Sequence, residues 1–194
     1  CCPAWSSMAK KLYPEYRECI SMALTPMTLT ARLIKEQHQN AKVVFIGPCA
    51  AKKLEAMRKS VRSEVDFVLT FEEMMGIFEA KDIDVASLTE EVEGINDASE
   101  DGRNFAVSGG VAQSVVNVIQ ERYPEREIKI ANAEGLRDCR KLLMMAKAGK
   151  YNGYLLEGMG CPGGCVAGAG TMQSIKKSQN AVKKYAAQAN HKNS

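Results

Sequence analysis

The stretch Tyr154–Gly170 reads YLLEGMGCPGGCVAGAG and places the thiols of Cys161 and Cys165 among residues of very small volume. Thiolates are the ligands that soft metals prefer, and glycine lets the backbone fold closely around a bulky inorganic group. The apolar run Tyr154–Leu156 precedes the thiols, which is typical of a loop at the end of a buried strand. In open α/β sheets, ligands bind at the carboxyl ends of the strands. The stretch therefore predicts an α/β fold with a soft-metal site at a strand end.

The composition argues against two classes of partner. The 194 residues suit one domain or two small lobes, and 45% hydrophobic with 25% charged residues is ordinary for a soluble globular chain. The net charge is only +3 and the basic residues are scattered, which argues against nucleic-acid binding. No run of about 18 apolar residues is present, so we expect no membrane span.

Cysteine usage indicates a reducing compartment. The count is odd and the chain is not small, unlike a secreted disulfide scaffold. Metal binding fits better, and we expect a cytoplasmic protein. Cys19 and Cys139 fall in predicted helices, where we expect buried, inert thiols. The seven cysteines are Cys1, Cys2, Cys19, Cys49, Cys139, Cys161 and Cys165.

Short β-branched runs alternate with helical segments of about 10–15 residues, which is typical of βαβ units. Strands are predicted over 42–46, 67–70, 128–131 and 154–157. Helices are predicted over 5–12, 26–38, 50–59, 71–80, 111–123, 136–148 and 174–187. The acidic stretch 82–102 reads as an exposed loop with short structure, and the polar tail 190–194 as frayed. We expect a mainly parallel sheet flanked by helices, with the cysteine site at the carboxyl edge of the strands.

Five cysteines come from three separated segments, each beside a proline. These thiols are Cys1, Cys2, Cys49, Cys161 and Cys165. Two of the segments follow predicted strands, which a parallel sheet would bring to one edge. A convergent site of four or five thiolates suits an iron–sulfur cluster or zinc, and unligated redox thiols also remain open. Structural zinc usually uses paired Cys-x2-Cys knuckles, which this sequence does not contain, so an iron–sulfur cluster is favoured.

Three segments resemble the signatures of [FeFe]-hydrogenase catalytic domains in residues, order and separation. They read CCPAW from Cys1, GPCAAKKLE from Gly47, and EGMGCPGGC from Glu157. The resemblance spans nearly the whole chain, and the domain that it implies is assigned to residues 1–194. It implies the family's H-cluster, a [4Fe–4S] cube joined through one cysteine to a two-iron unit with CO, cyanide and a bridging dithiolate. It also implies H2 and protons as substrates and an electron partner such as a ferredoxin or an accessory iron–sulfur domain.

The resemblance also assigns roles to single residues. The ligands of the cube would be Cys2, Cys49, Cys161 and Cys165, and Cys165 would bridge to the two-iron unit. Cys1 would pass protons to and from the bridging amine, and Ser21 would supply a hydroxyl to the proton relay. Lys52 would donate a hydrogen bond to a cyanide, and Met159 would pack beside the two-iron unit.

At three places the sequence departs from the pattern of catalytic members. In these departures it resembles a divergent branch of the family that is thought to sense hydrogen or redox state. Gly47 stands where catalytic members usually carry methionine. Met27 occupies a position that is often polar, and residues 168–172 replace a stretch that usually ends in Gln-Pro. The branch assignment implies an H-cluster that reports on hydrogen rather than sustaining turnover.

A further departure concerns the start of the chain. Family domains carry a substantial segment before the first cysteine pair, so we interpret this chain as a partial H-cluster domain with little or no H2 turnover alone. Two other classes stay open, namely a non-catalytic [4Fe–4S] module and a zinc-stabilised interaction domain. Residues 108–110 (SGG), before a predicted helix, fit either an anion cradle or a tight turn.

Overall fold

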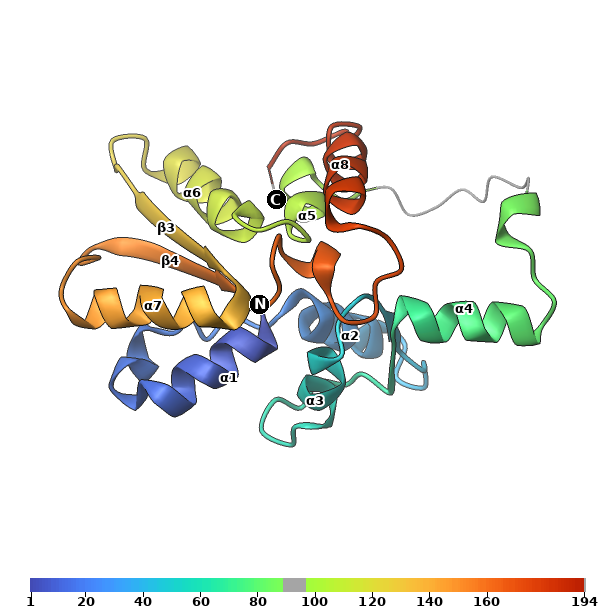
Figure 1. Cartoon of the computed structure of the whole chain (residues 1–194). Helices are drawn as coiled ribbons and strands as arrows, with labels where there is room; N and C mark the ends of the chain where they lie inside the picture. The colour runs from blue at the N-terminus through green and yellow to red at the C-terminus, as the bar shows by residue number, and fades with distance from the viewer. Residues whose placement is uncertain (89–96, 194) are drawn as a thin grey trace.

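The computed structural model describes residues 1–88 and 97–193, and its elements alternate between helices and short strands (Figure 1). The α-helices are α1 (Pro3–Leu12), α2 (Pro26–Gln37), α3 (Ala51–Met57), α4 (Phe71–Ala80), α5 (Glu100–Asn104), α6 (Gly110–Arg122), α7 (Gly135–Lys147) and α8 (Ile175–Ala186). The 3-10 helices are η1 (Pro14–Cys19), η2 (Val85–Ser87) and η3 (Cys165–Ala167). The strands are β1 (Val44–Ile46), β2 (Phe67–Leu69), β3 (Lys129–Glu134) and β4 (Tyr154–Met159).

The strands pair in parallel, and helices flank them, which confirms the predicted fold class. In the described residues they form two separate two-stranded sheets, β1–β2 and β3–β4, rather than one continuous sheet. In the second sheet Lys129 lies beside Tyr154 and Glu134 beside Met159, so both strands end at the same level. The loop after β4 leaves from this shared carboxyl edge, as the sequence predicted.

Local sequence signals explain where the helices begin. Thr25 caps α2 by accepting the Thr28 N–H, with Pro26 at the first helical position. Thr70 and Glu73 form a capping box on α4, because each side chain accepts the other residue's backbone N–H. The start of β1 is tied to the segment before β2 by Asp66, whose carboxylate accepts the Val43 N–H at 2.8 Å. That hydrogen bond and Lys35 hold the pKa of Asp66 well below its ordinary value.

Helices cover both sides of the β3–β4 pair, with α6 on one side and α7 on the other (Figure 1). Helix α1 lies along α7, and the buried residues Ala9, Tyr13 and Leu143 form the core between them. The indole of Trp5 packs directly on the backbone of Gly158 in β4. A small residue at 158 is therefore what lets α1 approach the sheet.

The acidic stretch is only partly an exposed loop, which corrects the prediction for its end. Of residues 82–102, those at 89–96 lie outside the described residues, while Asp101 in α5 is buried and accepts two contacts from the Asn117 amide, at 2.9 and 3.0 Å. The tail contributes to the same region. The carbonyls of His191 and Lys192 accept the backbone N–H groups of Glu100 and Asp101.

Helix α8 is attached to α5 by one buried arginine. The Arg103 guanidinium lies 4.1 Å from the ring centre of Tyr185 and donates to the Tyr185 carbonyl at 2.8 Å. This cation–π contact holds α8 against α5. None of the described helices is both long and apolar enough to span a bilayer.

Replacing Gly158 by alanine should destabilise the fold by about 1–3 kcal/mol, because the new methyl group would overlap the Trp5 ring. Urea denaturation measures the change. Gly76→Ala in α4 is the matched control, since a Cβ at 76 meets no atom within 4 Å, and this change should stabilise the chain by about 0.5–1 kcal/mol. Equal effects of the two substitutions would contradict the packing described here.

Candidate functional site

Four predicted ligand cysteines converge on the loop that follows β4. Cys2 precedes α1, Cys49 lies between β1 and α3, and Cys161 and Cys165 lie in the loop. The thiol of Cys2 accepts the Gly160 N–H at 3.3 Å, which joins the first segment to the third. Burial raises the pKa of Cys161, and the charges of Cys49 and Cys2 raise it further. Segments far apart in sequence thus place their thiols within electrostatic reach of one another.

Cys165 is the most strongly perturbed of these thiols. Burial raises its pKa to about 11, and Cys2 and Cys49 add to the shift, whereas Lys52 acts in the opposite direction. All seven cysteines are free thiols. Among residues 1–88 and 97–193, no group of three or more His, Cys, Asp or Glu side chains is arranged to hold a single metal ion. Four cysteine sulfurs are the donor set of a [4Fe–4S] cluster, so the residues present fit that group.

The loop, residues 160–170, opens with a tight turn. The Gly164 N–H donates to the Cys161 carbonyl at 3.1 Å, and Pro162 and Gly163 are its two central residues. Gly163 has φ +83°, the value of the third position of a type II turn. Gly164 has φ +99°, and a Cβ there would overlap the backbone of Ala106 and Ser108. Glycine is required at 163 by its positive φ, and at 164 by its positive φ and by the closeness of the neighbouring backbone.

The end of the loop reaches the first sheet. A Cβ on Gly168 would overlap the Pro48 carbonyl, and one on Gly170 would overlap the side chain of Thr70. The Gly170 N–H donates to the Pro48 carbonyl at 3.0 Å. Pro48 follows β1 and Thr70 follows β2, so the loop packs on the carboxyl ends of both strands. This packing brings Cys49 to the loop.

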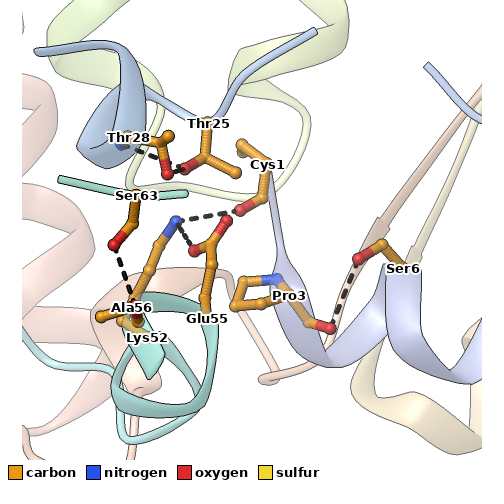
Figure 2. A network of polar contacts seen from close by, with 9 residues as sticks. All are labelled: Cys1, Pro3, Ser6, Thr25, Thr28, Lys52, Glu55, Ala56 and Ser63. Carbon is orange, nitrogen blue, oxygen red and sulfur yellow. Dashed lines mark hydrogen bonds and ion pairs between the residues drawn. The ribbon is translucent and has the colours of Figure 1, made fainter. Parts of the chain in front are cut away.

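Lys52 is buried beside Cys1, and its charge is matched by Glu55 (Figure 2). Its ammonium donates to the Glu55 carboxylate at 2.7 Å and to the Cys1 carbonyl at 3.4 Å. A buried lysine requires such a partner, because removing one member of a buried pair leaves an uncompensated charge. Glu55 was not predicted from the sequence, although its spacing of three residues from Lys52 on one helix was a usable signal. The predicted hydrogen bond from Lys52 to a cyanide stays a prediction.

The other predicted site residues lie in different surroundings. Cys1 is exposed at the start of the chain. Ser21 is exposed in the loop before α2, where its hydroxyl accepts the Ala23 N–H at 3.2 Å. Met159 ends β4 and is only 2% exposed. The roles of these three residues at an iron site stay predictions.

Glu157 is a second residue that sequence analysis did not identify. It lies in β4, is buried, and accepts the Gly109 N–H at 3.0 Å and the Ala112 N–H at 2.8 Å. These donors belong to the N-terminus of α6, where a carboxylate is favoured by the helix dipole. The turn at 108–110 therefore binds a carboxylate of this same chain. The turn also donates the Ser108 N–H to the Gly163 carbonyl at 3.2 Å, which links Glu157 to the cysteine loop.

The two remaining cysteines differ from each other. Cys139 is fully buried in α7, as predicted, and its thiol donates to the Met159 carbonyl at 3.4 Å. The prediction for Cys19 was wrong, because Cys19 is exposed. It ends η1, a 3-10 helix without a fully buried residue, in which Tyr16 rather than Cys19 packs against the core.

Glu157→Gln should lower the free energy of unfolding by about 1–3 kcal/mol. The amide can replace only one of the two acceptor oxygens and leaves a buried N–H without an acceptor. Chemical denaturation of the purified chain measures the loss. Glu79→Gln on the exposed face of α4 serves as the control and should change stability by less than about 0.5 kcal/mol. A loss no larger than that of the control would refute the role of Glu157.

Burial raises the pKa of Cys139 from 9.0 to about 11, so its thiol should resist alkylation at pH 8 while exposed Cys19 reacts. The unfolded chain loses this proton first as the pH rises. The thiol's contribution to stability is therefore present below pH 9 and declines between 9.0 and about 11. Mass spectrometry after timed iodoacetamide treatment tests the first point, and a Cys139→Ala variant without this pH dependence tests the second. Rapid alkylation of Cys139 in the native chain would contradict its burial.

The sequence of this chain is similar to a known family and to curated proteins. The family described as "Iron only hydrogenase large subunit, C-terminal domain" matches residues 1–169. The periplasmic [Fe] hydrogenase large subunit of Nitratidesulfovibrio vulgaris is 27% identical over 210 residues, covering 88% of this chain and 50% of the relative. The cytosolic Fe-S cluster assembly factor NAR1 of Kluyveromyces lactis is 28% identical over 136 residues, covering 66% of this chain and 29% of that protein.

The fold is also similar to that of solved hydrogenase structures. A variant of [FeFe]-hydrogenase HydA1 from Chlamydomonas reinhardtii superposes with a TM-score of 0.75 at 22% identity, covering 94% of this chain and 64% of that one. The chain spans 50% of the N. vulgaris relative, so it corresponds to part of such a protein. Since the family match covers most of the sequence and includes all four converging cysteines, the chain belongs to the family of the iron-only hydrogenase large subunit, C-terminal domain.

Proposed function

We propose that Cys2, Cys49, Cys161 and Cys165 hold a [4Fe–4S] cluster, and that Cys165 connects it to the two-iron unit of an H-cluster. The observation that carries the proposal is the convergence of thiols from three segments on the glycine loop after β4. When bound, the H-cluster supplies reversible interconversion of protons and H2. The proposed role of the parent protein is this conversion, or the sensing of H2 or redox state.

The surrounding residues supply the electrostatic conditions for such a group. The Cys165 thiol is protonated at neutral pH without metal, so cluster binding must release protons. Lys52 lies close enough to favour the Cys165 thiolate, and its ammonium group donates to the Glu55 carboxylate at 2.7 Å. A buried cation beside four thiolates offsets part of their mutual repulsion. Lys52 also has the chemistry to donate to a cyanide of the two-iron unit.

Proton and electron supply are further parts of the proposal. Exposed Cys1 has a thiol suited to passing protons toward the buried site, with Ser21 as a second relay group. Electrons would come from a ferredoxin or an accessory iron–sulfur domain. A cytoplasmic location remains our proposal for the parent protein, based on its free cysteines.

A non-catalytic iron–sulfur role is the second candidate, and a specific observation favours it. At Gly47, where catalytic members usually have methionine, a Cβ would lie 2.8 Å from the ring of Phe45. The aromatic ring therefore takes the space that a larger side chain at 47 would need. The likeness to NAR1, named as an Fe-S cluster assembly factor, fits the same role.

Anaerobic reconstitution with iron and sulfide should give a brown chain with about four iron atoms. Subsequent loading with a synthetic two-iron unit should add CO and cyanide bands in the infrared spectrum. Cys165→Ser should lose both signals, whereas Cys19→Ser, at an exposed thiol outside the site, should keep them. We expect little or no H2 evolution from this chain alone.

The possible outcomes separate the candidates. A brown chain without infrared bands would support the non-catalytic module and refute the H-cluster. A colourless chain that binds zinc stoichiometrically would refute both. Sustained H2 evolution by the chain would contradict the expected inactivity.

A further inference from the structure

We propose that Glu134 is a positioning residue that sets the conformation of the cysteine loop. Glu134 ends β3, and one of its carboxylate oxygens accepts the Gly163 N–H at 2.6 Å. The inference depends on the proposed function in one respect only, namely that the loop positioned by Glu134 binds a cluster. The contact itself is a property of the metal-free chain.

The turn sequence alone leaves two conformations open. Proline at the second position of a turn suits both type I and type II, and glycine at the third position permits either sign of φ. The two types differ by a flip of roughly 150° in the peptide between these positions. Here that peptide joins Pro162 to Gly163, and its N–H points to Glu134. The Glu134 carboxylate therefore stabilises the type II turn, because the flipped peptide of a type I turn would direct the Gly163 N–H away from it.

Contacts on the other side of Gly163 complete the restraint. Its carbonyl accepts the Ser108 N–H at 3.2 Å and the Gln179 side-chain amide at 3.4 Å. Both polar groups of this residue are therefore held, by donors and acceptors from β3, from the turn before α6, and from α8. Since Cys161 and Cys165 flank the turn, its type determines how the two thiols are directed relative to each other.

The location of Glu134 also follows from the sheet. Its register partner in β4 is Met159, two residues before Cys161, so the carboxylate lies beside the point where the loop departs. Glu134 itself is largely exposed, so its replacement disturbs no core. A hydrogen bond to a charged group is among the stronger ones, which suits a contact that fixes the peptide of a turn whose glycines, Gly163 and Gly164, are buried.

Hydrogen exchange at the Gly163 amide tests the proposal directly in the metal-free, full 194-residue chain. Glu134→Ala should speed exchange there by about tenfold or more, the equivalent of losing one charge-assisted hydrogen bond. Glu134→Gln keeps an acceptor oxygen and should restore most of the protection. Asp138→Ala is the matched control, because this carboxylate lies in the first turn of α7 and pairs with Lys141 instead.

Reconstitution provides a second measurement. Glu134→Ala should bind less iron and sulfide than wild type at an unchanged unfolding midpoint, and Glu134→Gln should recover the loss. Equal Gly163 exchange in wild type and Glu134→Ala would refute the proposal. Failure of the wild-type chain to assemble a cluster would instead refute the proposed function, while the exchange rates would still decide the role of Glu134.

Discussion

The close packing of backbone against backbone around residues 163–170 is the constraint on which the site depends. At Gly164, Gly168 and Gly170 a single methyl group would overlap another segment, respectively the 106–108 turn, Pro48 and Thr70. These segments follow or precede different elements, so the loop acts as the common surface on which both small sheets and α6 meet. Short two-stranded sheets are weakly stable by themselves. Their carboxyl ends are held together here through main-chain contacts that only glycine permits.

The carboxylates near this loop show a common principle. Glu157 accepts from the N-terminus of α6, Glu134 accepts from Gly163, and Glu55 pairs with Lys52. Each carboxylate accepts from a donor of the same chain. Glu157 and Glu134 thereby position backbone segments near the thiols, and Glu55 positions the ammonium group of Lys52. A site that gathers several thiolates gains from carboxylates that are already engaged, because free ones nearby would add repulsion.

Sequence patterns captured the elements whose signals are local. Thr70 and Glu73 form a capping box within one turn, and the predicted helix 71–80 coincides with α4. Strand β3 extends to Glu134, beyond the predicted 131, because pairing with β4 outweighs the poor strand propensity of its last residues. The convergence of the cysteines was predicted from parallel strands that share one sheet edge, but β1, before Cys49, and β4, before Cys161, lie in separate sheets, and loop 160–170 joins their carboxyl ends. The partners of Glu157 and Glu134 lie some 30 to 50 residues away, so no local pattern revealed them.

The contact between Phe45 and Gly47 has a consequence for the evolution of this site. The two positions lie on the same side of the chain as it leaves β1, and the ring of one occupies the volume next to the other. A methionine at 47 would require the Phe45 ring to shift or to be replaced by a smaller side chain, so the two positions are expected to be coupled. The identity of residue 47 therefore depends on that of residue 45, and ancestral reconstruction of the family should treat the two positions as a pair.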